Sequence, residues 1–90
     1  MSIFTNTVVA GTSATILHKG SNPSGDYLLI TTHNNSADVY IGGSTVTPSS
    51  NGIVVPKSTN QYITVPFGET IYCAGNGTDT VKLLTFKNGL

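Results

Sequence analysis

The chain has 90 residues, and its four basic and four acidic side chains give a formal net charge of zero at pH 7, with only 9% of residues charged. This composition argues against a nucleic-acid-binding protein, which needs a basic surface to displace counterions, and equally against binding to an anionic membrane surface. The single cysteine, Cys73, excludes an internal disulfide, and the sequence holds no cluster of His and Cys residues of the kind that binds structural zinc. We expect one domain spanning residues 1–90, because domains typically contain about 50 to 250 residues.

Oligomerisation is then the remaining way for so small a domain to gain stability. A domain of this size buries only about 60% of the surface that its unfolded chain exposes, and small folds are usually supported by disulfides, metals or association. Thr, Ser, Asn and Gly take the place of the missing charged residues. Because such a surface loses little hydration free energy when it is covered, the composition favours packing against other subunits.

No targeting segment is expected. Residues 1–17, MSIFTNTVVAGTSATIL, contain neither a basic start nor a continuous apolar run, which a secretory signal needs. No window approaches the run of about 18 apolar residues that suggests a membrane-spanning helix. A lone cysteine is consistent with synthesis in a reducing cytoplasm.

Turn-forming residues recur along the whole chain and separate short runs rich in Thr, Val, Ile and Tyr. Residues of these types fit a pleated sheet and disfavour helix, and regularly spaced turns are typical of a sandwich or barrel. We therefore predict an all-β fold, an antiparallel β-sandwich of seven or eight short strands, for which the jelly roll is one arrangement. Residues 1–10 could instead form an N-terminal arm. The expected strands are residues 3–9, 13–18, 27–33, 37–42, 60–66, 70–74 and 80–87, with a short eighth at 53–55.

Side-chain alternation assigns the faces of these strands, because successive residues point to opposite sides of a sheet. In residues 27–33, Leu28 and Ile30 share one face, while Tyr27 and Leu29 share the other. In residues 60–66, Tyr62 points away from the core face. The expected core consists of Val39, Ile41, Ile63, Val65, Ile71, Val81 and Leu83.

The last strand, TVKLLTFK, is apolar on both faces. Val81 and Leu83 line one face, and Leu84 and Phe86 line the opposite one. A strand that is apolar on both faces is usually buried on both, and in so small a sandwich the second cover could come from another chain. We expect Leu84 and Phe86 to form an oligomer or capsid contact, together with Ile3 and Phe4 near the start of the chain.

Residues 37–55, ADVYIGGSTVTPSSNGIVV, predict a connection across the sandwich. Gly42 and Gly43 end a core strand, because glycine has no side chain to continue the packing. Hydroxyl side chains then satisfy nearby backbone groups, and Asn51-Gly52 turns the chain back. No titratable side chain lies between Asp38 and Lys57, so this loop does not look catalytic.

Catalytic and metal-binding patterns are absent from the sequence. His18 and His33 sit at strand ends, where a solvated or hydrogen-bonded histidine is the simpler interpretation. A triad of His33, Asp38 and a serine can be written, but the chain is so rich in serine that the triple carries little weight, and no GxSxG motif occurs.

The remaining reactive side chains also have structural interpretations. Asp26 and Asp79 stand at turn-to-strand boundaries and are expected as Asx turns or edge charges. Residues 75–79, GNGTD, lack the acidic repeat of a calcium loop. Cys73 is expected as a small buried side chain. We predict no catalytic residue, no metal and no cofactor, and hence that the protein is not an enzyme.

Two segments resemble a known group of proteins. Residues 34–55, NNSADVYIGGSTVTPSSNGIVV, and residues 62–84, YITVPFGETIYCAGNGTDTVKLL, resemble small virion proteins of tailed bacteriophages, which share a VYIGGS-type core, a turn, an IY pair and a final apolar strand. The departures are Pro48 and a longer PKSTNQ connection. The resemblance implies a structural protein of the virion, and the shared motif carries no chemistry.

The resemblance and the composition together favour a capsid decoration or cement protein that stabilises contacts between major capsid subunits. Its partners would be the major capsid protein and itself, most simply as a homotrimer, with no nucleic acid and no membrane. It would lie on the capsid exterior, after passing through the host cytoplasm during assembly. A tail, neck or fibre component is the first alternative. A carbohydrate-binding or adhesin-like module is the second, because the four tyrosines could form a platform for sugars.

Overall fold

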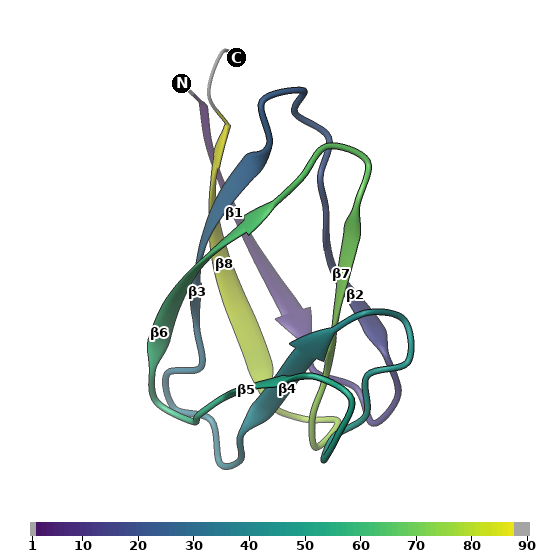
Figure 1. Cartoon of the computed structure of the whole chain (residues 1–90). Helices are drawn as coiled ribbons and strands as arrows, with labels where there is room; N and C mark the ends of the chain where they lie inside the picture. The colour runs from purple at the N-terminus through teal and green to yellow at the C-terminus, as the bar shows by residue number, and fades with distance from the viewer. Residues whose placement is uncertain (1, 88–90) are drawn as a thin grey trace.

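The structure, a computed structural model, describes residues 2–87, which form eight antiparallel β-strands in two four-stranded sheets packed face to face (Figure 1). The strand order is β1-β8-β3-β6 in the first sheet and β2-β7-β4-β5 in the second. Consecutive strands change sheet at every step except β4 to β5, as in a jelly roll. The strands are β1 (Ser2–Val9), β2 (Thr15–Lys19), β3 (Asp26–Thr31), β4 (Val39–Gly42), β5 (Ile53–Val55), β6 (Asn60–Val65), β7 (Thr70–Ala74) and β8 (Thr80–Lys87).

These strands confirm the predicted fold class, including the short strand at residues 53–55. Every predicted boundary lies within two residues of the observed one. The strand expected at residue 37 begins at Val39, because the backbone N–H groups of Ser36 and Ala37 donate to the carboxylate of Asp79, at 3.0 and 2.9 Å, and not to a neighbouring strand. Within residues 2–87 there is no helix long and apolar enough to cross a membrane.

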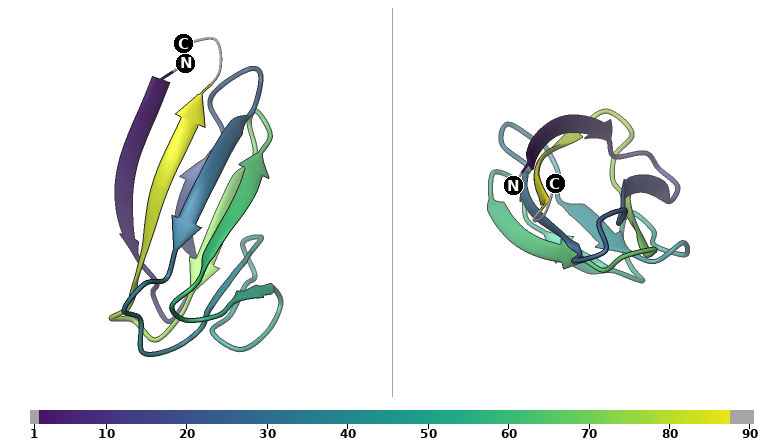
Figure 2. Two further views of the ribbon diagram at one scale, coloured as in Figure 1. Left: turned by 90° about the vertical axis from the view of Figure 1, so that its left-hand side faces the viewer. Right: turned by 90° about the horizontal axis from the view of Figure 1, so that it is seen from above.

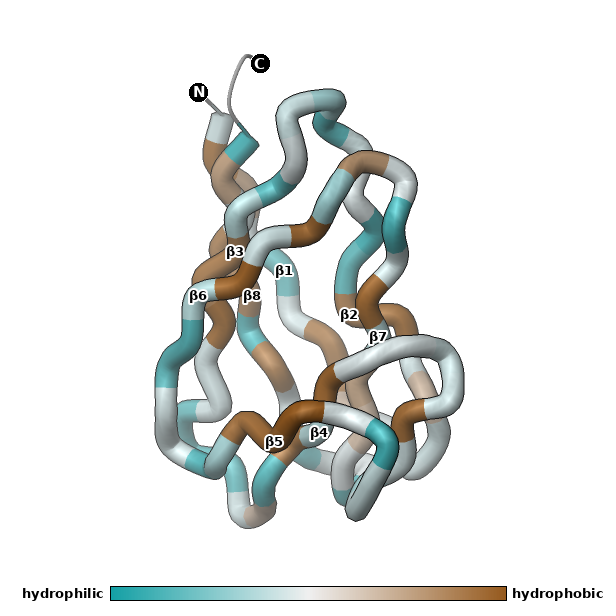
Figure 3. The backbone as a smooth tube through the Cα atoms, viewed as in Figure 1, coloured by the Kyte–Doolittle hydropathy of each residue, from teal (hydrophilic) through white to brown (hydrophobic). Residues whose placement is uncertain are grey.

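The core lies between the two sheets, and Figure 3 shows apolar segments recurring along the strands that enclose it. Five of the seven predicted core residues are buried, and Ile63 and Ile71 are partly buried against them. Leu28 and Ile30 complete this layer on β3, as the alternation of that strand indicates. The other buried apolar residues of the core cluster are Ala10, Leu17, Val55 and Cys73.

The connection between β4 and β5 folds back over the end of the core. Val46, in the middle of this polar stretch, is buried. Thr47 and Ser50 bond each other through backbone and hydroxyl groups, which confirms that hydroxyls satisfy the loop. Asn51 turns the chain at a φ of 59°, and Gly52 passes so close to β4 that an added Cβ would lie 2.5 Å from the carbonyl oxygen of Ile41. Glycine is therefore required there.

The segment considered as an N-terminal arm contributes β1. Residues Ser2–Val9 pair antiparallel with β8 along their whole length, from Ser2 opposite Lys87 to Val9 opposite Thr80. Figure 2 shows β1 at the edge of its sheet, beside β8 and with no further strand on its other side. Of the described residues at this end of the chain, only Val8 of β1 packs against the core.

Candidate interaction surface

The outer face of the β1-β8-β3-β6 sheet carries a group of apolar side chains, which we call the outer patch. Strand register places them in two adjacent rows: Phe86 lies opposite both Ile3 and Tyr27, and in the next row Leu29 lies opposite both Leu84 and Tyr62. Since residues opposite each other in an antiparallel sheet share a face, the rows form one continuous surface. The outer patch consists of Ile3, Tyr27, Leu29, Tyr62, Leu84 and Phe86.

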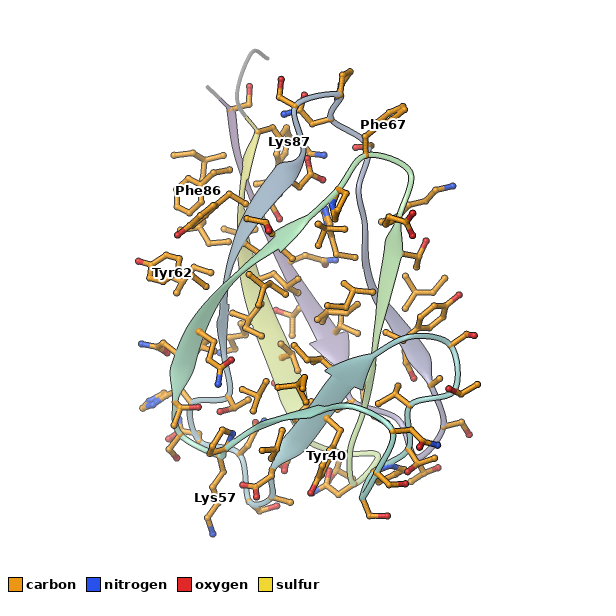
Figure 4. The ribbon with its side chains drawn as sticks, viewed as in Figure 1. Tyr40, Lys57, Tyr62, Phe67, Phe86 and Lys87 are labelled. Carbon is orange, nitrogen blue, oxygen red and sulfur yellow. The ribbon has the colours of Figure 1, made fainter. Side chains whose placement is uncertain are left out.

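Three aromatic rings make up the centre of the outer patch. The ring centroid of Tyr27 lies 5.4 Å from that of Tyr62, tilted by 47°, and 6.2 Å from that of Phe86 in an edge-to-face arrangement. Tyr62 is 62% exposed, and Figure 4 shows Tyr62 and Phe86 projecting on the same side, away from the core. Exposed apolar groups that gather in this way mark interaction sites in soluble proteins.

A shallow groove of about 540 Å³ continues the outer patch along the same face. Leu29 and Leu84 belong to the groove as well as to the outer patch. Most of the other residues that line the groove are polar, and Lys82 is the charged one among them. The polar lining is formed by Thr5, Asn6, Thr7, Thr31, Asn60 and Lys82.

The structure brings together three of the four predicted contact residues. Ile3, Leu84 and Phe86 share the outer patch, whereas Phe4 lies opposite Thr85, which is buried, and so faces the other side of the sheet. Phe4 is nevertheless exposed, because it lies near the free end of the edge strand. Side-chain alternation predicted that Tyr27 and Leu29 share a face and that Tyr62 points away from the core. It could not place these residues beside Phe86, because strand order was unknown.

Asp26 differs from its sequence interpretation. Expected as an Asx turn or an edge charge, it is buried between the sheets, where its Oδ2 atom lies 2.5 Å from His18 Nε2 and 2.9 Å from Lys87 Nζ. Burial alone would raise the pKa of Asp26, but hydrogen bonds to His18, Lys87 and the Ser21 N–H outweigh it and lower that pKa. The three side chains come from three strands, so neither sequence spacing nor turn chemistry could have revealed the cluster.

Asp79 links two loops through hydrogen bonds. Its carboxylate accepts hydrogen bonds from the backbone of Ser36 and Ala37 and from the amide of Asn76. Desolvation would raise the pKa of Asp79, but these bonds outweigh it and lower that pKa. The Asx turn of this region is made by Asn76, whose Oδ1 accepts the N–H of Asp79 at 2.8 Å. The cluster has a structural role in holding the loop before β4.

Two further reactive side chains, His33 and Cys73, lie outside the Asp26 and Asp79 clusters. His33 is exposed, and Cys73 is fully buried, which raises the pKa of its thiol to about 11. Among residues 2–87, no three His, Cys, Asp or Glu side chains are grouped so as to hold a metal ion. The outer patch is thus the surface whose composition calls for a functional explanation.

No family model and no curated protein matches the chain. Among solved structures, the chain is similar to one from Bacillus endospore appendages, described as a novel family of disulfide-linked pili. The two share 15% sequence identity with a TM-score of 0.60, over 96% of this chain and 85% of the other. A similarity at this identity shows that the fold is shared.

Proposed function

We propose that the protein is a non-enzymatic structural subunit that associates with other subunits through the outer patch. The observation that carries this proposal is the aromatic cluster on one sheet face of a sparsely charged chain, in which Tyr27 and Tyr62 are exposed and Phe86 is half-buried. Covering these rings with a neighbouring subunit removes apolar surface from water, which stabilises the complex by about 25 cal/mol for each Å² of apolar surface buried. The scarcity of charge keeps the cost of desolvation low.

Within that class, the proposed role is a capsid decoration or cement protein on the exterior of a tailed-phage virion. The sequence resemblance of residues 34–55 and 62–84 to phage virion proteins supports it. A filled capsid is under internal pressure, so its joints gain from added buried area that requires no chemistry. A homotrimer that spans neighbouring major capsid subunits would multiply each contact by avidity.

The shared fold of the Bacillus appendage is consistent with a subunit that is used in many copies. Those pili are described as disulfide-linked. The one cysteine of this chain, Cys73, is fully buried on β7. Assembly of this protein is therefore proposed to be non-covalent, with the outer patch in the role that covalent links play in those pili.

The test is the stoichiometry of the protein in purified virions, measured by quantitative mass spectrometry against the major capsid protein. The decoration role requires a copy number comparable with that of the major capsid protein, on the order of hundreds. A count of six or twelve, or labelling confined to the tail, would replace it with the tail, neck or fibre role.

A carbohydrate-binding role is the second candidate, because one observation favours it. Tyr62, an exposed ring that could stack on a sugar, lies beside the groove lined by hydroxyl and amide side chains. Glycan-array binding that is lost in Tyr62→Ala and kept in Tyr40→Ala would support it. Equal signals from the two variants, or none from the unmodified protein, would leave only the structural role.

A further inference from the structure

The free edge of β1 lacks the features by which proteins usually prevent edge strands from pairing. Its residues, Ser2–Val9, include no charged side chain and no proline. The opposite sheet is better protected, since β2 carries Lys19 and a register irregularity between Ile16 and His18, and β5 has only three residues. A long edge strand without charge, proline or bulge is a template for another strand.

The sequence of β1 is nearly symmetric about Asn6. Reading outward from Asn6, Thr5 matches Thr7, Phe4 matches Val8, and Ile3 matches Val9, so the pattern is apolar, apolar, polar, polar, polar, apolar, apolar. The apolar residues at both ends are largely on the surface: Ile3 is 58%, Phe4 50% and Val9 51% exposed. Burial within the chain does not account for this pattern. Among Ile3, Phe4, Val8 and Val9, Val8 alone packs against the core.

We propose that β1 pairs with β1 of a second copy of the chain, antiparallel and about a two-fold axis that passes through Asn6. In that register each residue faces a residue of its own kind: Ile3 faces Val9 of the second copy, and Phe4 faces its Val8. Asn6 faces Asn6. Residues that face each other across the two-fold axis point to the same side of the sheet. The β1-containing sheets of the two copies therefore join into one continuous sheet of eight strands.

Neighbouring registers with the same faces are less favourable. A two-fold axis at Thr5 would place Ile3 opposite Thr7 and Phe4 opposite Asn6, and an axis at Thr7 would place Val9 opposite Thr5. Both leave apolar side chains against polar ones, whereas cross-strand pairs of like kind stabilise a sheet. A two-fold contact also requires a self-complementary surface, and only the axis at Asn6 gives one along all of residues 3–9.

This contact does not depend on the proposed function. It uses the edge of the sheet, whereas the outer patch lies on the sheet's face, so a copy can make both contacts at once. Ile3 belongs to both and would extend the apolar surface across the two-fold axis. One strand pair buries less than the roughly 1,600 Å² of a standard interface, so the pair is expected to dissociate on dilution.

Disulfide trapping tests the contact and its register together. Opposite residues on paired strands have Cα atoms about 4.5–5.5 Å apart, within reach of a disulfide, whereas residues offset by two positions are about 8 Å apart and out of reach. Asn6→Cys, oxidised at high protein concentration, should give a covalent dimer on a non-reducing gel. Thr5→Cys should stay monomeric, and the native protein is the control because Cys73 is buried. Circular dichroism confirms folding of each variant.

A second variant keeps the test independent of cysteine chemistry. Asn6→Lys places two like charges directly opposite each other and should reduce edge pairing at least tenfold in sedimentation velocity, while Asn60→Lys, on the edge strand β6, should not. Dimers of Thr5→Cys in place of Asn6→Cys would overturn the register. If no cysteine variant is trapped and Asn6→Lys sediments like the native protein, edge pairing is wrong, whatever the copy number in virions.

Discussion

The imidazole Nε2 of His18 lies 2.5 Å from the carboxylate Oδ2 of Asp26, and this contact joins the two sheets of the sandwich, because His18 belongs to β2 and Asp26 to β3. Lys87 on β8 contacts the same oxygen at 2.9 Å. A buried carboxylate needs such partners to offset its lost hydration. The contacts of Asp26 with His18 and Lys87 therefore stabilise one end of the core, although the chain as a whole has few charged residues.

The Asp26 cluster should make stability depend on acid pH. In the folded protein the pKa of Asp26 is lowered below the usual 3.8. The stability that its ionised carboxylate contributes is therefore present above about pH 4 and is lost as the pH falls through the folded-state pKa. At pH 7, Asp26→Asn should lower the free energy of unfolding by about 3 kcal/mol, since it leaves buried partners uncompensated. Urea denaturation at pH 7 and pH 3 measures this, and the difference between variant and native protein should shrink at pH 3.

Glu69→Gln is the matched control, because it also removes one negative charge but at an exposed position between β6 and β7. It should leave the urea midpoint at pH 7 nearly unchanged. Equal midpoints for Asp26→Asn and Glu69→Gln would show that the ion pairs contribute nothing net.

Ile41→Ala should unfold most of the protein. Ile41 is buried on β4, and truncation of a buried isoleucine typically costs about 2–5 kcal/mol, close to the whole stability of so small a domain. Ile53, directly opposite on β5 but exposed, provides the control, and Ile53→Ala should melt like the native protein. Thermal melts by circular dichroism decide between them, and a normal melt for Ile41→Ala would contradict the core assignment.

Gly52→Ala should destabilise the β4–β5 connection, while Gly43→Ala should not. A Cβ at Gly52 would lie 2.5 Å from the Ile41 carbonyl oxygen and 2.6 Å from Val46, whereas a Cβ at Gly43 meets nothing within 4 Å. Overpacking of this kind costs about 1–3 kcal/mol. Denaturant midpoints of the two variants give the comparison, and equal values would mean that the loop moves freely away from β4.

Phe86→Ser should weaken association through the outer patch. Loss of one large apolar contact is expected to raise the dissociation constant about tenfold. Phe67→Ser removes an equally large ring from the exposed loop between β6 and β7, outside the outer patch, and should leave association unchanged. Sedimentation equilibrium measures both. Similar constants for the two variants would move the interface to another surface.

Cys73 should be unreactive in the folded protein. Its side chain is fully buried and burial raises its pKa to about 11, so little thiolate is present or reachable at pH 8. An aromatic disulfide reagent should react with about one thiol per chain in urea and with almost none in buffer. Rapid reaction in buffer would reopen a covalent mode of assembly like that of the disulfide-linked pili.

Local patterns in the sequence were enough to predict the strands. Turn residues and β-branched runs depend on nearby atoms only, which is why residues 53–55, 70–74 and 80–87 match the structure. Alternation also predicted that Leu84 and Phe86 lie on one face of the last strand and that Val81 and Leu83 lie on the other. The strand start at residue 37 was wrong by two residues because Asp79, which is distant in sequence, takes the backbone N–H groups there.

By itself, the sequence determined which residues form strands and which side chains of one strand share a face, because backbone preference and side-chain alternation are local properties. Only the tertiary structure decided which strands are neighbours. That order places Tyr27, Tyr62 and Phe86 in one outer patch, turns Phe4 away from it, and leaves β1 at an edge. It also encloses Asp26 between His18 and Lys87, since a carboxylate at a turn is buried or exposed according to what the opposite sheet brings against it.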